Sequence, residues 1–227
     1  MFEEIIKLAG GEVENGIVLK PGIKIIQKSE PTDFARQLFQ QLHLSKNDYE
    51  ALAEFNNRLT YLNFSDRHDA DYLKNIVVKH GHLSGFSATN ITFLLAGISI
   101  EASLEMIAHS EAVVSRLTTS KTKAMDVPLL VKHPNTPPEE FEKAAAYLKS
   151  FDAASPENRE FRNRCHPGIK ATVLTYTMNL KQFHRLFIGR MPKAGNEEEV
   201  RDICFEMCSQ LNELYPLIIK APAEYLG

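Results

Sequence analysis

The sequence predicts an α+β fold in which helices and strands are interspersed and the C-terminal half is largely helical. Residues 89–96 and 172–178 are rich in β-branched and aromatic side chains, which indicates buried strands. Residues 180–188 and 197–214 have the apolar periodicity of amphipathic helices. The elements do not follow the regular order of βαβ units, and the length of 227 residues suits one large domain, 1–227.

Residues 1–68 are expected to form a hairpin and short helices. Asn15-Gly16 favours the positive φ angles of a tight hairpin turn, and it lies between two short apolar runs. Ser45 with Asp48 resembles a capping box for the helix that follows. The expected elements are a helix at 2–9, strands around 13 and at 17–19 and 23–26, and helices at 34–44 and 45–55.

In the middle of the chain, apolar spacing predicts a helix over 69–80 that ends at Gly81. This helix places His82 and Ser84 in the loop that follows it. Gly97 is expected to end the strand at 89–96. The remaining expected elements are a helix over 99–114, a polar stretch over 115–123, a helix over 139–151 and a short helix over 158–164.

Charge and hydropathy exclude several classes of function. The 26 Lys and Arg residues are balanced by 29 Asp and Glu residues, so we expect no binding of polymeric nucleic acid, although a small phosphorylated ligand remains compatible. No apolar run approaches the roughly 18 residues of a membrane span, so no membrane association is expected. The acidic start Met1-Phe2-Glu3-Glu4 differs from an export signal, and we expect a cytoplasmic protein.

Common catalytic motifs are missing from the sequence, which contains no nucleophile elbow, P-loop, dinucleotide glycine fingerprint or Cys-X-X-Cys pair. His80, His82 and His109 could ligate a metal ion, but no carboxylate or thiolate pattern accompanies them, so no metal site is expected. Cys204 and Cys208 share a stripe with apolar residues and are expected to be reduced thiols in the core.

Hydroxyl and cationic side chains recur near the predicted strands. Such groups suit recognition of a phosphate and a heterocycle, but they could equally form a solvated surface with a few helix caps. The set comprises His82 and Ser84 before the first long strand, His109, Ser115, Arg116, Thr118 and Lys121 after the next helix, and Asn179, Lys181 and Arg190 after the last strand.

Three motifs occur in a fixed order along the chain. His80-Gly81-His82-Leu83-Ser84 precedes a strand and a helix that leads to His109, and Thr177-Met178-Asn179-Leu180-Lys181 and Glu199-Val200-Arg201 follow much later. They resemble the motifs of the flavin-dependent thymidylate synthases. That family has His-Gly-His-X-Ser or Thr, then Arg-His-Arg, then Thr-X-Asn-X-Arg and Glu-Ile-Arg.

The resemblance covers about residues 69–216, and the family signature is altered within it. Ala108-His109-Ser110 stands where the family has Arg-His-Arg, and Thr118 stands where it has its second serine. The final arginine of the signature is missing, with Lys121 one residue away. Since the family's guanidinium groups hold the flavin ring and the nucleotide, Arg116 or Lys121 would have to replace them.

The resemblance implies a central, largely antiparallel twisted sheet flanked by helices, and a homotetramer with sites shared between subunits. It implies FAD as cofactor and reductive methylation of deoxyuridine monophosphate (dUMP) or a related pyrimidine nucleotide, with methylenetetrahydrofolate and NADPH as co-substrates. The implied FAD ligands are His82, Ser84, His109, Asn179, Lys181 and Arg185. The implied nucleotide ligands are Ser115, Arg116, Thr118, Lys121 and Arg190, of which Arg190 and Thr118 would be the catalytic residues.

Two alternatives remain open at this point. A divergent paralogue could keep the scaffold and bind a flavin or nucleotide without catalysis or with an altered substrate, as Ala108 and Ser110 suggest. The similarity could also mark a shared core alone, in which the strands at 89–96 and 172–178 serve packing.

Overall fold

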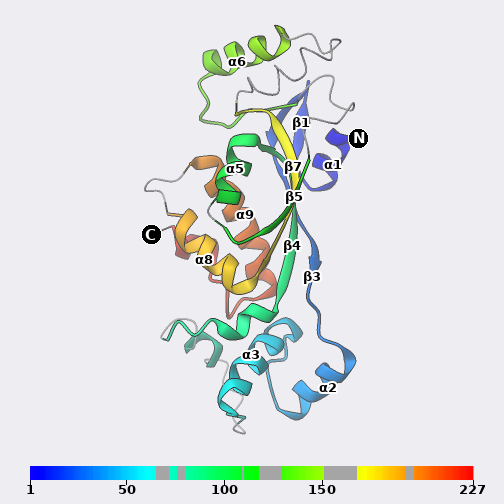
Figure 1. Cartoon of the computed structure of the whole chain (residues 1–227), viewed down its shortest axis with the longest axis vertical. Helices are drawn as coiled ribbons and strands as arrows, with labels where there is room; N and C mark the ends of the chain where they lie inside the picture. The colour runs from blue at the N-terminus through cyan, green and yellow to red at the C-terminus, as the bar shows by residue number, and fades with distance from the viewer. Residues whose placement is uncertain are drawn as a thin grey trace. The chain divides into compact units, whose positions relative to one another are not determined.

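The computed structural model describes residues 1–64, 72–75, 80–108, 110–117, 129–150, 168–192 and 197–226. The chain folds into two compact units. The first unit comprises Met1–Lys24, Leu94–His109 and Val114–Tyr176, and the second comprises Ile25–Phe93, Ser110–Val113 and Thr177–Gly227. The strands form a three-stranded sheet of order β1-β2-β6 and a four-stranded sheet of order β3-β4-β7-β5 (Figure 1). The predicted α+β class is confirmed.

The first unit begins with the expected helix and hairpin. Asn15 and Gly16 have φ angles of 50° and 79°, so the hairpin turn is the one that the Asn-Gly pair predicts. A core of Ile6, Val18 and Ala96 with residues of the later strands holds this unit together. Its elements include α1 (Phe2–Leu8), β1 (Glu12–Glu14), β2 (Ile17–Lys20), α5 (Ile100–Ala108), β6 (Leu130–Val131) and α6 (Pro138–Ser150). Strand β6 pairs in parallel with β2 and was not expected, because two apolar residues give no periodic signal.

The four-stranded sheet consists of β3 (Gly22–Lys28), β4 (Asn90–Ser99), β5 (Val113–Arg116) and β7 (Ala171–Asn179). The Thr92 and Thr177 hydroxyls lie 2.9 Å apart, and the Leu180 amide donates to the Thr89 carbonyl at 2.9 Å. These contacts run along β4 and β7 in opposite directions, so the central pair is antiparallel.

The expectation that Gly97 ends its strand was wrong. Gly97 has a φ of +80°, and a Cβ there would lie 3.0 Å from side-chain atoms of Ile6 and Val18. The glycine therefore permits a close approach within a continuous strand instead of stopping it. The following helix is shorter than the expected 99–114, because it ends at Ala108 and Val113 already lies in β5.

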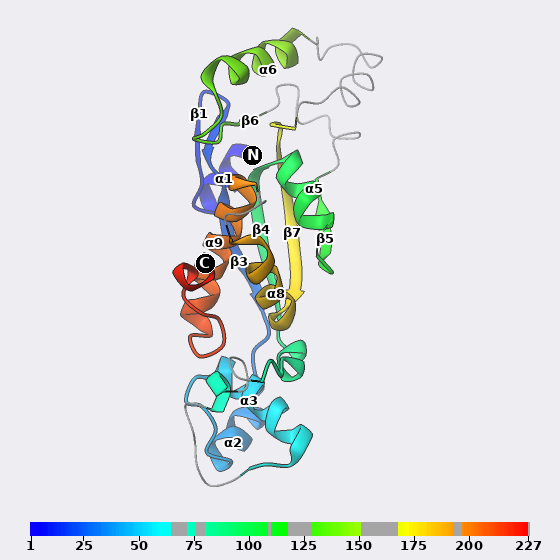
Figure 2. The same cartoon turned by 90° about the vertical axis from the view of Figure 1, so that its left-hand side faces the viewer.

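The second unit contains the helices of the C-terminal half. Phe183 of α8 packs edge-on against Phe93 of β4, with ring centroids 5.4 Å apart, and α8 lies beside α9 (Figure 2). Asn47 caps α3 by accepting a hydrogen bond from the Tyr49 amide, so the predicted capping box of Ser45 and Asp48 was wrong. The helices of this unit include α2 (Asp33–Gln41), α3 (Asp48–Tyr61), the 3-10 helix η1 (Ser84–Ala88), α8 (Leu180–Arg190), α9 (Glu198–Leu214) and the 3-10 helix η2 (Pro222–Tyr225).

The remaining helix predictions have mixed outcomes. The predicted helices over 139–151, 180–188 and 197–214 are confirmed by α6, α8 and α9. Of the helix expected over 69–80, residues 72–75 are described and helical. The short helix expected over 158–164 lies outside the described residues.

Candidate functional site

Helix α8 starts at the end of β7, and Asn179 determines where it begins. The Asn179 Oδ1 accepts from the Gln182 amide at 3.0 Å, and the Gln182 Oε1 accepts from the Asn179 amide at 2.9 Å. This reciprocal capping box satisfies two backbone donors that the first helical turn would leave unpaired. The predicted ligand Asn179 is therefore a helix cap, and its Nδ2 is the donor that remains for a ligand.

Lys181 and Arg185 lie one turn apart on α8 and share a face of the helix. Arg185 is exposed and Lys181 is half-buried, and neither forms an ion pair with a carboxylate among the described residues. The nearby Glu111 carboxylate instead accepts a hydrogen bond from Gln182 Nε2 at 3.0 Å. Two cations on one helix face, neither paired with a carboxylate in the described ranges, are suited to an anionic ligand such as a phosphate.

Arg190 does not join this face. It follows Lys181 by nine residues, which places the two on about opposite sides of the helix and about 13 Å apart along its axis. Arg190 is half-buried, and its charge acts on Cys204 of the neighbouring helix α9. The structure thus separates Arg190 from the cations predicted to bind FAD.

Ser84 is the first residue of η1, His82 lies two residues before it, and both side chains are exposed. Helix η1 packs against α8, and the carbonyl of Thr89, just after η1, accepts the hydrogen bond from the Leu180 amide at 2.9 Å. The second unit therefore brings together the segment of His82 and Ser84 and the helix of Lys181 and Arg185, although about a hundred residues separate them in the sequence.

Ser115 and Arg116, two of the predicted nucleotide ligands, lie on strand β5 in the first unit. Successive side chains of a strand point to opposite faces, so these neighbours do not share a surface. The Arg116 Nη1 donates to the Ser103 Oγ of α5 at 3.2 Å. The polar stretch expected over 115–123 thus begins as a strand. His109, Thr118 and Lys121 lie outside the described residues.

Cys204 and Cys208 are core residues, as predicted. Both are free thiols without solvent exposure on the buried face of α9. Burial raises the pKa of each thiol to about 12, and the nearby charge of Arg190 offsets this only in part at Cys204. A neutral thiol is a poor nucleophile, so this pair has no role in nucleophilic catalysis.

In the part of the chain that the structure describes, His, Cys, Asp and Glu side chains form no group of three that could hold a metal ion. Within the same ranges, no helix has the length and apolar composition that crossing a membrane requires.

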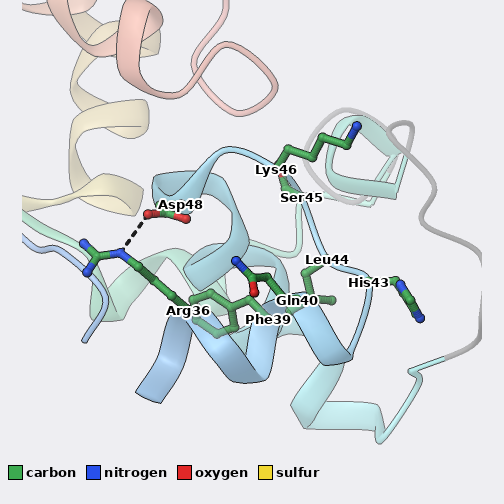
Figure 3. A pocket seen from close by; sticks show the side chains of 8 residues that line it. All are labelled: Arg36, Phe39, Gln40, His43, Leu44, Ser45, Lys46 and Asp48. Carbon is green, nitrogen blue, oxygen red and sulfur yellow. Dashed lines mark hydrogen bonds and ion pairs between the residues drawn. The ribbon is translucent and has the colours of Figure 1, made fainter. Parts of the chain in front are cut away.

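A pocket of about 390 Å³ lies between α2 and the start of α3, and none of its lining residues is a predicted site residue (Figure 3). Phe39 and Leu44 form an apolar part of its wall. Arg36 Nε donates to Asp48 Oδ2 at 2.9 Å across the pocket, whereas His43 extends away from this pair (Figure 3). The Arg36 cation is already paired with Asp48 and also with Asp33, and Lys46 is the other cation of the lining.

Residues 28–217 match the family model described as thymidylate synthase complementing protein, Thy1. The chain belongs to the thymidylate synthase complementing protein family. This confirms the resemblance that the ordered motifs suggested. No match was found among curated proteins.

Two solved structures share the fold of this family member. One is a UMP/dUMP methylase, PolB, from Streptomyces cacaoi bound with 5-Br UMP, with a TM-score of 0.66 and 11% identity over 92% of this chain and 96% of that chain. The other is Thymidylate Synthase X (ThyX) from Helicobacter pylori with FAD and dUMP, with a TM-score of 0.65 and 17% identity over 87% of this chain and 96% of that chain. At these identities, the likeness establishes the fold.

One polar feature of helix α3 was not expected from the sequence. Helix α3 buries four polar side chains at the spacing of one helix face: Glu50, Glu54, Asn57 and Arg58. A polar stripe at the i, i+4, i+7 and i+8 positions was the available signal, but apolar periodicity, the usual sign of a buried helix face, does not reveal it. Of these side chains, Asn57 contacts η1, because its Oδ1 accepts a hydrogen bond from the Gly85 amide.

Proposed function

We propose that this chain binds FAD and a uridine-type nucleotide, dUMP or a close relative, and catalyses reductive methylation of the pyrimidine. Membership of the thymidylate synthase complementing protein family supports the reaction class. The observation that carries the proposal is the contact between η1, which begins at Ser84 two residues after His82, and helix α8, on which Lys181 and Arg185 lie.

The described residues fit a dinucleotide such as FAD. The pyrophosphate of FAD requires positive charge and hydrogen-bond donors, which Lys181, Arg185 and the Ser84 hydroxyl would supply. The exposed ring of His82 can stack or donate a hydrogen bond to a heterocycle. The Nδ2 of Asn179 adds a donor at the start of α8. His109, from outside the described residues, completes the proposed set of FAD ligands.

Arg190 would hold the pyrimidine by charge-assisted hydrogen bonds, while Thr118 and Lys121 would bind the nucleotide phosphate. Ser115 or Arg116, which point to opposite faces of β5, would lie beside it. Because Arg190 lies on the far side of α8 from Lys181, one chain would contribute to two different sites. A homotetramer whose sites are shared between subunits meets this requirement. Thr118 and Arg190 are the proposed catalytic residues.

Reduced flavin would supply the hydride, methylenetetrahydrofolate the one-carbon unit and NADPH the electrons that regenerate the flavin. The protein side chains would orient the ligands and neutralise their charge. The bound nucleotide phosphate carries negative charge that Lys121 would offset. Arg190 would fix the ring with its planar guanidinium fork, a geometry that a lysine at the same position cannot reproduce.

Titration of the purified protein with FAD, followed by flavin fluorescence and the visible spectrum, tests the binding step. A hydrogen bond to a charged group contributes about 1.5 to 3 kcal/mol, so Lys181→Ala and Arg185→Ala should each weaken FAD binding by about tenfold or more. Lys143→Ala is the charge-matched control, since Lys143 is 68% exposed and lies on α6 of the first unit. Equal affinities for all variants would contradict the proposed α8 face.

Rescue of a thymidine-requiring host by the gene tests the reaction. Growth without thymidine, abolished by Arg190→Ala, supports thymidylate synthesis. The Arg190→Ala protein should weaken nucleotide binding and keep its thermal unfolding midpoint. Failure of the unmodified gene to rescue, together with no flavin binding, would refute the enzymatic proposal.

A second candidate is a non-catalytic or substrate-altered paralogue that binds a flavin or nucleotide. The observation that favours it is local: Ala108 is exposed at the end of α5, and the Ser110 hydroxyl accepts a hydrogen bond from the Ala112 amide at 3.4 Å. Neither side chain can replace the arginine that the family has at that position. Flavin binding without rescue of the thymidine-requiring host would favour this candidate.

A further inference from the structure

Two neighbouring asparagines of α3 form hydrogen bonds to the backbone of helix η1. The Gly85 amide donates to the Asn57 Oδ1 at 3.3 Å, and the Gly85 carbonyl accepts from the Asn56 Nδ2 at 3.4 Å. Both polar groups of one backbone unit are therefore bound by side chains of another helix. Such bonds fix the position of a short irregular segment that has few hydrogen bonds of its own.

The orientation of Asn57 is itself fixed. Its side chain is 3% exposed, and its Nδ2 donates to the Ala53 carbonyl at 3.0 Å, one turn earlier in α3. The Oδ1 is then the atom that accepts the hydrogen bond from the Gly85 amide. A Cβ on Gly85 would overlap the Asn57 carboxamide, so the glycine allows the two to approach this closely. Phe86, the residue after Gly85, is fully buried and so holds this part of η1 against the core.

The other end of this segment is tied to α8 through the Leu180 amide and the Thr89 carbonyl. His82 and Ser84 precede Gly85 by at most three residues. Their place relative to Lys181 and Arg185 therefore depends on where Gly85 is held, and Asn57 is the buried group that holds it.

We infer that Asn57, assisted by Asn56, is a positioning residue for the ligand-binding segment of His82 and Ser84. This inference rests on the proposed function, since it assigns these two side chains to the FAD site. Asn57 touches no ligand itself. It keeps η1 in the arrangement that binds FAD, so its loss lowers the fraction of molecules that are competent to bind, and the apparent dissociation constant rises in proportion.

Asn57→Ala and Asn47→Ala form a matched pair for the test. Asn57 lies within α3 and Asn47 is its N-cap, and each substitution breaks two hydrogen bonds. The Asn47 Oδ1 accepts from the Tyr49 amide, and its Nδ2 donates to the Leu214 carbonyl at 3.0 Å. Asn47 has no contact with η1 among its recorded hydrogen bonds. Both variants are expected to unfold at lower temperature, so FAD binding is measured well below both midpoints.

We expect Asn57→Ala to weaken FAD binding by about tenfold and to alter the visible spectrum of the bound flavin, as an order-of-magnitude population effect. Asn47→Ala should stay within about twofold of the unmodified protein. Equal effects of the two variants, or unchanged affinity of Asn57→Ala, would overturn the inference.

Amide hydrogen exchange without any ligand separates this inference from the proposed function. Exchange at Gly85 and Phe86 should accelerate by about tenfold or more in Asn57→Ala and remain unchanged in Asn47→Ala. If the unmodified protein binds no FAD, the proposed function fails, and this exchange result still decides whether Asn57 holds η1. Unchanged exchange in Asn57→Ala would refute the positioning role whatever the flavin result.

Discussion

Replacing Glu54 by alanine should destabilise the second unit strongly, because Glu54 forms a buried ion pair in α3. Arg58 Nε donates to Glu54 Oε1 at 2.7 Å, and the two side chains are 4% and 1% exposed. The guanidinium also donates to the Asn63 carbonyl at 3.2 Å and lies 3.9 Å from the centre of the Tyr72 ring. The second Glu54 oxygen accepts from the Ser45 amide at 3.0 Å.

The expected loss follows from this burial. Removing one partner leaves the Arg58 charge buried without its counterion, which costs about 3 to 5 kcal/mol. In a protein of this size, each kcal/mol lowers the unfolding midpoint by about 2 to 4 °C, so the midpoint should fall by about 6 to 20 °C. The exposed pair of Lys143 and Glu140, with an N–O distance of 2.9 Å and about two-thirds exposure, is the control. Its loss should cost less than about 1 kcal/mol.

Thermal and urea unfolding of Glu54→Ala and Glu140→Ala would measure the difference. A double variant, Glu54→Leu with Arg58→Met, should be more stable than Glu54→Ala, because it removes the unpaired charge together with its partner. Equal stability losses for Glu54→Ala and Glu140→Ala would refute the reasoning. So would a double variant less stable than Glu54→Ala.

Three further outcomes are expected. Gly97→Ala should lower stability by at least about 1 to 2 kcal/mol in urea unfolding, because a left-handed φ of +80° is unfavourable for alanine and its Cβ would be crowded. Cys204 and Cys208, with pKa values of about 12, should resist alkylation at pH 8 in the folded protein and react fully in denaturant, as mass spectrometry of peptides would show. Burial lowers the pKa of His184, which lies 3.2 Å from the Tyr225 hydroxyl, so its unfolded form binds a proton first and stability should fall as the pH drops below about 6.5. His184→Phe should flatten that slope in unfolding curves from pH 7 to 5, and an unchanged slope would contradict the assignment.

The fold could be predicted where one element determines its own structure. The Asn15-Gly16 turn needs no tertiary partner, since its positive φ angles follow from the residue types. Helices α8 and α9 have one apolar face long enough to be recognised from periodicity. Gly97 was misjudged because a glycine in a strand can end it or permit a close approach, and the distinction depends on Ile6 and Val18, about eighty to ninety residues earlier.

For the predicted site residues, too, the sequence indicates local motifs but not which segments lie together in the fold. The order of the motifs led to the correct family, because the residue types of a motif can be read from the sequence alone. The motifs do not specify how their residues are arranged in space. The structure adds the contact between η1 and α8, which the sequence does not indicate because about ninety residues separate the two helices. The opposite faces of Ser115 and Arg116 become apparent once β5 is known to be a strand, whereas the sequence indicated a polar stretch.

Asn57 shows why the buried polar face of α3 could not be predicted from the sequence. A polar residue within an amphipathic helix is ordinarily assigned to the solvated face, yet α3 turns Glu50, Asn57 and Arg58 inward, each with a partner. Glu50 accepts from the Leu217 amide at 2.6 Å, so the same face holds both the C-terminal segment and η1. Burial raises the pKa of Glu50, because it disfavours the charged carboxylate, and the hydrogen bond from the Leu217 amide offsets this only in part. A polar stripe at helical spacing is therefore a signal of its own, because burying such groups is tolerable only when a specific segment of the fold receives their hydrogen bonds.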